Sequence, residues 1–110
     1  MRLNAKSKNI EITPSLNTFI EGKLGKLEKF LKRMEETREF VIDVEVSRTT
    51  KHHKKGNVYR AEANLEIGKK LLRAESESAD LRVSIGEVYK ELEREIVKFK
   101  EKLQVKNRKS

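Results

Sequence analysis

The stretch FVIDVEVSRTTKHHKKGNVYRAEANLEI, residues 40–67, decides the fold, because apolar and polar side chains alternate on both sides of a basic turn. The apolar set before the turn is Phe40, Ile42, Val44 and Val46, and the apolar set after it is Tyr59, Ala61, Ala63, Leu65 and Ile67. This period of two predicts a pair of half-buried strands, and Gly56-Asn57 is a turn signal between them. We therefore expect a β-hairpin with one apolar face.

The tip of this hairpin, residues 48–60, concentrates positive charge and contains no acidic residue. Its basic and histidine side chains are Arg48, Lys51, His52, His53, Lys54, Lys55 and Arg60. Because such a tip repels itself, binding to a polyanion is one explanation for it. A solvated loop that keeps the protein soluble explains the same composition equally well.

Two further strands are expected on either side of the hairpin. In residues 2–8, the small or apolar side chains of Leu3, Ala5 and Ser7 alternate with polar and basic ones. This alternation predicts a short first strand with a polar outer face. After a second turn signal at Gly68-Lys69-Lys70, residues 72–77 alternate in the same way. Because their connections are short, the last three strands should form an antiparallel meander.

Apolar residues recur every three or four positions in two other segments, which predicts amphipathic helices over residues 14–34 and 81–103. The first stripe consists of Leu16, Ile20, Leu24, Leu27, Leu31 and Met34, flanked by Phe19 and Phe30. The second stripe consists of Leu81, Ile85, Val88, Leu92, Ile96, Phe99 and Leu103. Thr13 is the expected N-cap of the first helix, and Ser78 or Asp80 that of the second.

The element order is therefore β-α-β-β-β-α, within one domain that spans residues 1–104. We predict an α+β two-layer sandwich, in which a four-stranded mixed sheet carries both helices on one face. The first and second strands should be parallel, because a helix crosses over between them. Residues 105–110 are expected to form a basic, disordered tail. Gly86 weakens the last helix by about 1 kcal/mol relative to alanine, and nothing in the neighbouring sequence accounts for it.

Composition and charge limit the function classes. The formal net charge of +8 and the pI near 9.8 favour nucleic acid or another anionic surface as the partner. With no cysteine and no long apolar segment, we expect a cytoplasmic protein with no membrane partner. The histidines are adjacent in the charged turn, and the aspartates, Asp43 and Asp80, are far apart in the chain. We therefore expect no catalytic residue, no metal, no cofactor and no small-molecule substrate.

Charges of opposite sign separate along the first helix. At about 100° per residue, its basic and acidic side chains fall on opposite flanks of the apolar stripe. The basic flank comprises Lys23, Lys26 and Arg33, the acidic flank comprises Glu21, Glu28 and Glu35, and Lys29 points straight outward. This separation of charge creates an electrostatic field that points from one flank of the helix to the other. A solvent-exposed face with randomly mixed charges would create no such field.

The last helix carries a basic row at successive i,i+4 positions, namely Lys90, Arg94, Lys98 and Lys102. A parallel acidic row supplies i,i+3 partners, namely Glu87, Glu91 and Glu95. A salt-bridged exposed face therefore explains this row as well as a binding surface does. Arg82, Tyr89 and Lys100 form a second basic flank that includes an aromatic ring.

The two tyrosines invite a base-stacking interpretation. Tyr59 shares the parity of the core-facing Ala61 and Leu65, however, so a core position is favoured. Tyr89 borders the apolar stripe and should be half-buried with its hydroxyl outward. Because aromatic residues make up only 5% of the chain, recognition of RNA shape and phosphates is favoured over base-by-base reading.

Over residues 2–103 the chain resembles the ribosome hibernation promoting factors and the related ribosome-associated translation inhibitor of bacteria. The resemblance rests on three segments, which are NIEITPSLNTFIEGKLGKLEKF, VEVSRTTKHHKKGNVYRAEANLEI and LLRAESESADLRVSIGEVYKELEREIVKFKEKL. It implies a fold similar to that of double-stranded RNA-binding domains. It also implies a non-catalytic protein that binds the small (30S) ribosomal subunit and its 16S ribosomal RNA in the decoding channel. There such proteins block the messenger and transfer RNA sites and repress translation in dormancy or stress.

The resemblance further implies that basic helix residues contact ribosomal RNA, and the matching positions are Lys23, Lys26, Lys29, Arg82, Lys90, Arg94, Lys98 and Lys100. The complete set of RNA-binding residues that we predict adds Arg33, Lys51, Lys54, Lys55 and Tyr89. We expect this chain to be monomeric. Two other functions stay open, which are a general double-stranded RNA binder and a protein–protein interaction module, the latter with weak salt dependence.

The chain departs from the family pattern at two places. Ser84-Ile85-Gly86 stands where the family commonly has an Ala-Ile-Asp-like run, so this chain lacks the acid that the family commonly has at that point. Long members also carry a C-terminal dimerisation domain, whereas this sequence ends at Ser110. We therefore expect a short-form protein or the N-terminal domain of a longer one.

Overall fold

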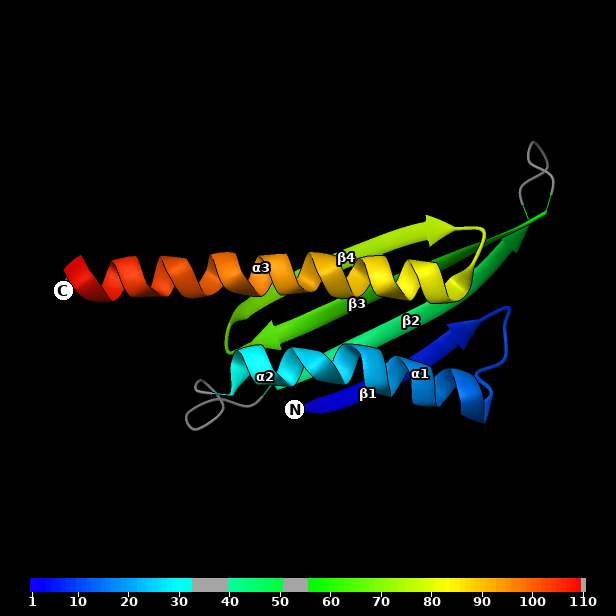
Figure 1. Cartoon of the computed structure of the whole chain (residues 1–110), viewed down its shortest axis with the longest axis horizontal. Helices are drawn as coiled ribbons and strands as arrows, with labels where there is room; N and C mark the ends of the chain where they lie inside the picture. The colour runs from blue at the N-terminus through cyan, green and yellow to red at the C-terminus, as the bar shows by residue number, and fades with distance from the viewer. Residues whose placement is uncertain (33–39, 51–55, 110) are drawn as a thin grey trace.

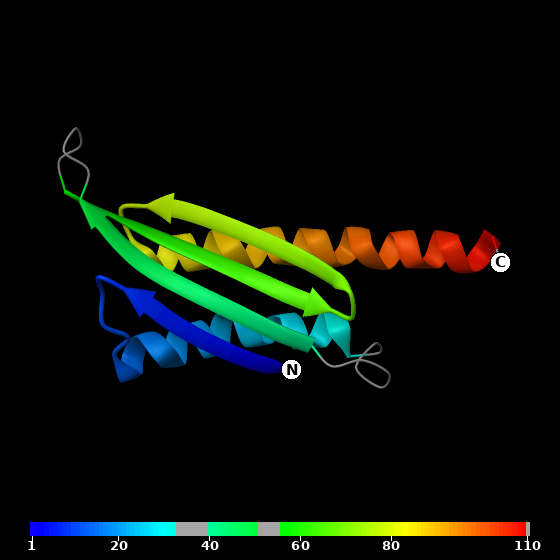
Figure 2. The ribbon, with the colours of Figure 1, turned by 180° about the vertical axis from the view of Figure 1, so that it is seen from behind.

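The computed structural model describes residues 1–32, 40–50 and 56–109 (Figure 1). Its elements in chain order are β1 (Arg2–Lys8), α1 (Pro14–Leu24), the 3₁₀ turn η1 (Gly25–Leu27), α2 (Glu28–Leu31), β2 (Phe40–Thr50), β3 (Asn57–Ile67), β4 (Lys70–Ser78) and α3 (Leu81–Lys109). The helices lie on one face of the sheet, and the view from behind shows the other face open (Figure 2). The predicted α+β two-layer sandwich is therefore confirmed.

The sheet is mixed and its strands follow the order β1-β2-β3-β4. β1 pairs parallel with β2, from Arg2 opposite Val41 to Lys8 opposite Ser47. β2 pairs antiparallel with β3, and β3 pairs antiparallel with β4. Both the crossover after the first strand and the antiparallel meander are therefore as predicted.

The core lies between the helices and the sheet. Its members come from alternate positions of the strands and from one stripe of each helix. The buried set is Leu16, Ile20, Leu24, Leu27, Leu31, Phe40, Ile42, Val44, Val46, Ala61, Ala63, Leu65, Ile67, Leu72, Ala74, Leu81, Ile85, Val88, Leu92 and Ile96. Phe99 is only partly buried at the edge of this core. Met34 lies outside the described residues.

Both predicted helix starts are confirmed by their hydrogen bonds. The Thr13 hydroxyl accepts a hydrogen bond from the Leu16 amide at 3.1 Å, and Pro14 is the first residue of α1. At α3 the Asp80 carboxylate accepts from the Arg82 amide at 2.9 Å. Asp80 is therefore the cap, while the Ser78 hydroxyl accepts from the Asp80 amide at 3.2 Å and holds the preceding turn.

Ser84 ties α3 to the sheet. It is fully buried, and its hydroxyl donates to the Tyr59 carbonyl of β3 at 3.0 Å. The same oxygen lies 2.8 Å from the Ser78 hydroxyl at the end of β4. A buried hydroxyl without partners would be costly, so these contacts explain why a polar residue is tolerated here.

The helices differ from the predictions at two places. The first helix, expected as one element over residues 14–34, is interrupted by η1, where the Glu28 amide donates to the Gly25 carbonyl. Glycine is a poor helix former, so it is a favourable site for such an interruption. α3 continues to Lys109, through residues 105–109 where a disordered tail was expected. The end of the chain contains neither glycine nor proline to stop it.

Two glycines of similar exposure should respond oppositely to replacement by alanine. Gly68 in the β3–β4 turn has φ +60°, a conformation that costs a residue with a side chain about 1 kcal/mol or more. Gly22 lies in α1 with free space around it, so Gly22→Ala should stabilise the protein by up to about 1 kcal/mol. Urea unfolding midpoints of the two variants should therefore move in opposite directions. A Gly68→Ala variant as stable as the wild type would contradict this account of the turn.

Candidate nucleic-acid interface

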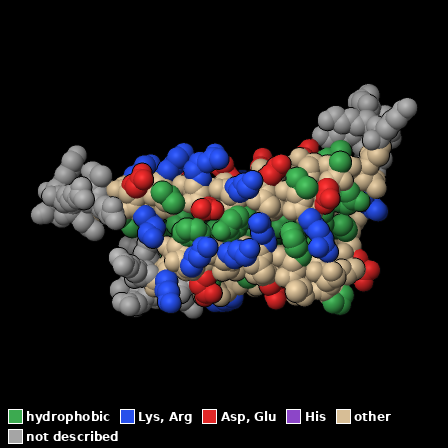
Figure 3. Space-filling model, in the orientation of Figure 1, with side chains coloured by type: hydrophobic (Ala, Val, Ile, Leu, Met, Phe, Trp, Pro, Cys, Tyr) green, Lys and Arg blue, Asp and Glu red, His purple; other side chains and the backbone are tan. Residues whose placement is uncertain are grey.

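The helix face of the molecule carries lysine and arginine side chains along both helices, with hydrophobic side chains between them (Figure 3). α3 packs against α1, η1 and α2, so the basic flanks of the two helical segments meet along one line. We call this line the helix seam and define it by Lys23, Lys26, Arg82, Tyr89 and Lys90. Residues far apart in the sequence thereby form a single candidate surface for a polyanion.

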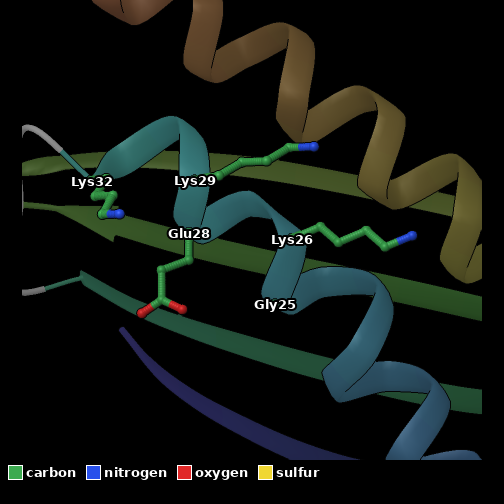
Figure 4. A pocket seen from close by; sticks show the side chains of 5 residues that line it. All are labelled: Gly25, Lys26, Glu28, Lys29 and Lys32. Atoms are coloured by element: carbon green, nitrogen blue, oxygen red, sulfur yellow. The ribbon is translucent and has the colours of Figure 1, made fainter.

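The predicted separation of charge on the first helix is confirmed for Lys23 and Glu28, whereas Lys29, expected to point straight outward, runs toward α3 (Figure 4). The Lys23 ammonium lies 5.0 Å from the centre of the Tyr89 ring on α3. On the other flank, the Glu28 carboxylate lies 3.4 Å from the amino group of Met1, beside β1. The acid is therefore held toward the sheet edge while the base faces the seam. Arg33 and Glu35 lie outside the described residues.

Lys26 and Lys29 extend the basic surface from the 3₁₀ turn. In Figure 4 both side chains run toward α3, while Glu28 points the other way, toward β1. They line a shallow pocket of about 360 Å³ together with Gly25, Glu28 and Lys32. Among the described residues, no carboxylate is paired with Lys26 or Lys29. Their charges are therefore available to an anion.

Arg82 joins the beginnings of α1 and α3. Its guanidinium donates to the Ser15 hydroxyl at 3.3 Å and lies 4.9 Å from the centre of the Phe19 ring. Neither partner is negatively charged, so the guanidinium keeps its full charge at this end of the seam.

Lys100 has a different role from the other predicted lysines. Its ammonium donates to the Phe30 carbonyl of α2 at 2.8 Å and is partly buried. A cation at this place satisfies one of the carbonyls left free at the end of a helix. Lys100 therefore joins α3 to α2, and its position is explained without a nucleic acid.

The basic row of α3 divides into paired and unpaired members. Arg94 pairs with Glu91 at 3.1 Å, and Lys98 lies 3.9 Å from Glu95, so the salt-bridge explanation holds for these two. Glu87, the expected partner of Lys90, instead accepts a hydrogen bond from the Ser76 hydroxyl of β4. Within the described part of the chain Lys90 has no ion pair.

The two tyrosines lie as their sequence positions predict. Tyr59 is partly buried and packs against the core, and Tyr89 is half-buried at the seam. Burial raises the pKa of Tyr89, and both the charge of Glu93 and a hydrogen bond to it add to this effect. The ring of Tyr89 already contacts Lys23, a role that sequence reasoning missed. Phe19 and Phe30 were also missed as partners of cations, although their positions beside the first apolar stripe were a signal.

The hairpin contributes little to the helix face within the described residues. Lys51, Lys54 and Lys55 lie outside the described residues, and Arg48 is exposed on β2. Arg60 lies on the open face of the sheet, where it pairs with Glu62 at 2.9 Å and with Glu75. Its charge is therefore neutralised on the side away from the helices.

Glu62 is the centre of this ion-pair network, which also includes Arg73 at 2.9 Å. Burial raises the pKa of Glu62, but hydrogen bonds from Arg60 and Asn64 and the charges of Arg73 and Arg60 outweigh burial, so the pKa is lowered overall. A lowered folded-state pKa stabilises the protein above the unfolded value, and this stabilisation is lost as the pH falls through the folded-state value.

Glu62→Gln should therefore destabilise the protein at pH 7 by up to about 1 kcal/mol. The difference from the wild type should shrink as the pH falls below the ordinary value of 4.5, because the wild-type carboxylate is then protonated too. Urea unfolding from pH 7 to pH 3 measures this. Glu66→Gln, at an exposed position on the same face of β3, is the matched control and should show a smaller difference. A difference for Glu62→Gln that did not change with pH would contradict the network.

Among the described residues, no cluster of three or more His, Cys, Asp or Glu side chains is placed to hold a metal ion. No helix in the described part of the chain is long and apolar enough to cross a membrane.

Comparison with known proteins places the chain among ribosome-associated relatives. Residues 3–104 match the family described as Sigma 54 modulation protein / S30EA ribosomal protein. The chain is 31% identical over 103 residues to a ribosome hibernation promoting factor of Klebsiella oxytoca, covering 94% of this chain and 97% of that protein. It is 30% identical to a ribosome hibernation promotion factor of Lactococcus lactis, of which it spans 54%. The crystal structure of the Thermus thermophilus Protein Y N-terminal domain matches with a TM-score of 0.74 and 27% identity, covering 90% of this chain and 99% of that one.

Proposed function

The chain belongs to the Sigma 54 modulation protein / S30EA ribosomal protein family, and from this premise we propose that it is a non-catalytic, ribosome-binding hibernation factor. The helix face docks against 16S ribosomal RNA in the decoding channel of the small subunit. There it blocks the messenger and transfer RNA sites and represses translation during dormancy or stress. Its place of action is the cytoplasm, and it acts as a monomer.

The observation that carries this proposal is the state of the cations along the helix seam. Lys23 and Arg82 are held by aromatic rings, and neither has a carboxylate partner among the described residues. Lys26 and Lys90 likewise have no ion pair within the described part of the chain. Cations that keep their full charge on a rigid scaffold are suited to RNA phosphates, whose contacts position a protein without reading bases.

A general double-stranded RNA binder is the second candidate, because phosphate recognition alone does not select one RNA. The rings of Tyr59 and Tyr89, which could stack on bases, are both partly buried against the protein. Recognition through shape and phosphates fits either an RNA duplex or folded ribosomal RNA.

Co-sedimentation with isolated small subunits over a series of salt concentrations separates these candidates. We expect the protein to pellet with subunits at low salt and to be released steeply as salt rises, because each neutralised phosphate releases counterions. A long RNA duplex added in excess should displace it only weakly. Easy displacement by the duplex would favour the second candidate, and absence from the pellet at low salt would overturn the ribosome proposal.

Charge reversal at the seam tests which face binds. The triple change Lys23→Glu, Lys26→Glu and Lys90→Glu should abolish pelleting, because it replaces three phosphate contacts with repulsion. Circular dichroism should show an unchanged fold, since none of the three side chains belongs to the buried core. The matched control is Arg2→Glu, Lys6→Glu and Lys8→Glu on the exposed face of β1, which makes the same change in charge. Equal losses in the two triple variants would mean that net charge alone, and not the helix face, determines binding.

A further inference from the structure

β4 is an edge strand, which pairs with β3 on one side only (Figure 2). In an antiparallel pair, alternate residues turn their backbone groups toward the partner strand, and Ile67 and Lys70, which flank the tight turn, do so. The backbone N–H and C=O groups of Leu71, Arg73 and Glu75 therefore point away from the sheet. Within the described part of the chain these outward groups have no hydrogen-bond partner.

This edge lacks two of the features that commonly prevent another chain from pairing with a strand. β4 is nine residues long and contains no proline. Its pairing with β3 is continuous from Lys70 to Ser78, so no bulge twists the edge away. The side chain of Leu71 is 53% exposed and offers an apolar contact at one end. An extended peptide would therefore find both main-chain partners and apolar surface here.

The surroundings of the β4 edge are acidic, although the formal net charge of the protein is +8. On the helix face, Glu87 accepts a hydrogen bond from the neutral Ser76 hydroxyl of β4 and has no ion pair among the described residues. On the open face, β3 and β4 carry more acids than bases, namely Glu62, Glu66, Glu75 and Glu77 against Arg60 and Arg73. Carboxylates therefore lie on both sides of the second half of β4.

The opposite edge of the sheet has the opposite sign. β1 carries Arg2, Lys6 and Lys8 and no acidic residue. A basic peptide should therefore be attracted to the β4 edge and repelled from β1, whereas RNA phosphates should have the reverse preference. Charge complementarity thus favours a protein segment over RNA as the partner of β4.

We propose that the β4 edge binds an extended, lysine- or arginine-rich segment of another protein as an additional antiparallel strand. The outward backbone groups of Leu71, Arg73 and Glu75 form the ladder hydrogen bonds. Basic side chains on alternate sides of the added strand contact Glu75 on the open face and Glu87 on the helix face. The helix seam lies on the other flank of α3, so this binding does not require RNA.

The backbone part of the proposal is tested by fluorescence anisotropy with the labelled peptide TKKKTTVLT. Antiparallel pairing places its lysines beside residues 75–77 and its leucine beside Leu71. In the variant TKKKTPVLT, proline removes an N–H that faces β4, so binding should weaken roughly tenfold. In TKKKPTVLT, proline removes an N–H that faces solvent, so binding should stay close to that of the parent peptide. Equal binding of the two proline peptides, or no binding of the parent peptide at low salt, would overturn the proposal.

The charge part is tested with the parent peptide and two variants of the protein. Glu87→Gln removes a carboxylate beside the edge but keeps an acceptor for Ser76, so it should weaken binding several-fold at low salt. The matched control is Glu101→Gln, which makes the same change in charge at an exposed position roughly 20 Å further along α3 and should bind as the wild type does. Equal losses in the two variants would show that only net charge matters, and the assigned edge would be wrong.

Sedimentation equilibrium distinguishes the proposed partner from a second copy of this chain. We expect a monomer without the peptide and a complex of one protein with one peptide in its presence. A dimer that the peptide dissociates would assign the edge to self-association and overturn the proposal. These assays contain no RNA, so their failure leaves the proposed function intact, and failure to pellet with small subunits leaves the peptide result intact.

Discussion

Burial of both helices on a single apolar face of the sheet is the constraint on which the rest of the structure depends. Each strand alternates, so the sheet offers one apolar face, and each long helix has one apolar stripe to bury. Both helical segments must therefore lie side by side on the same face (Figures 1 and 2). Their flanks then meet above the core, and whatever charges those flanks carry are brought together.

This packing decides which charges are exposed to a partner. On the open face of the sheet, acids and bases neutralise one another, as Glu62 does with Arg60 and Arg73. On the helix face, Lys23 and Arg82 are held over aromatic rings. The rings restrict the motion of these side chains without neutralising their positive charge. The two faces of one small domain thus differ in electrostatic character, although each contains many charged residues. A polyanion meeting the protein is expected to find the helix face the more attractive one.

Most of the fold could be predicted from the sequence, because periodicity reports burial directly. The period of two in residues 40–67 and the stripes that begin at Leu16 and Leu81 identified the strands, the helices and nearly all of the core. The candidate site was predicted less completely. Glu87 was expected to pair with Lys90 from its spacing along the helix, but it bonds to Ser76 on a strand that helical spacing cannot reveal. The extent of α3 and the interruption at Gly25 were also missed. Helix propensity is a poor guide to where a helix ends and to whether a single glycine interrupts it.

The sequence by itself determined the class of fold, the excess of positive charge and the separation of sign along the first helix. These properties are local, since they follow from which residues stand two, three or four positions apart. Only the tertiary structure decided which cations keep their charge, because that depends on neighbours from distant parts of the chain. Lys23 meets Tyr89 across the seam, and Lys100 is used to hold α2, although both are lysines on a basic flank. The difference arises because electrostatic and hydrogen-bonding partners are set by distance in space, which the packing of two helices on one sheet face determines.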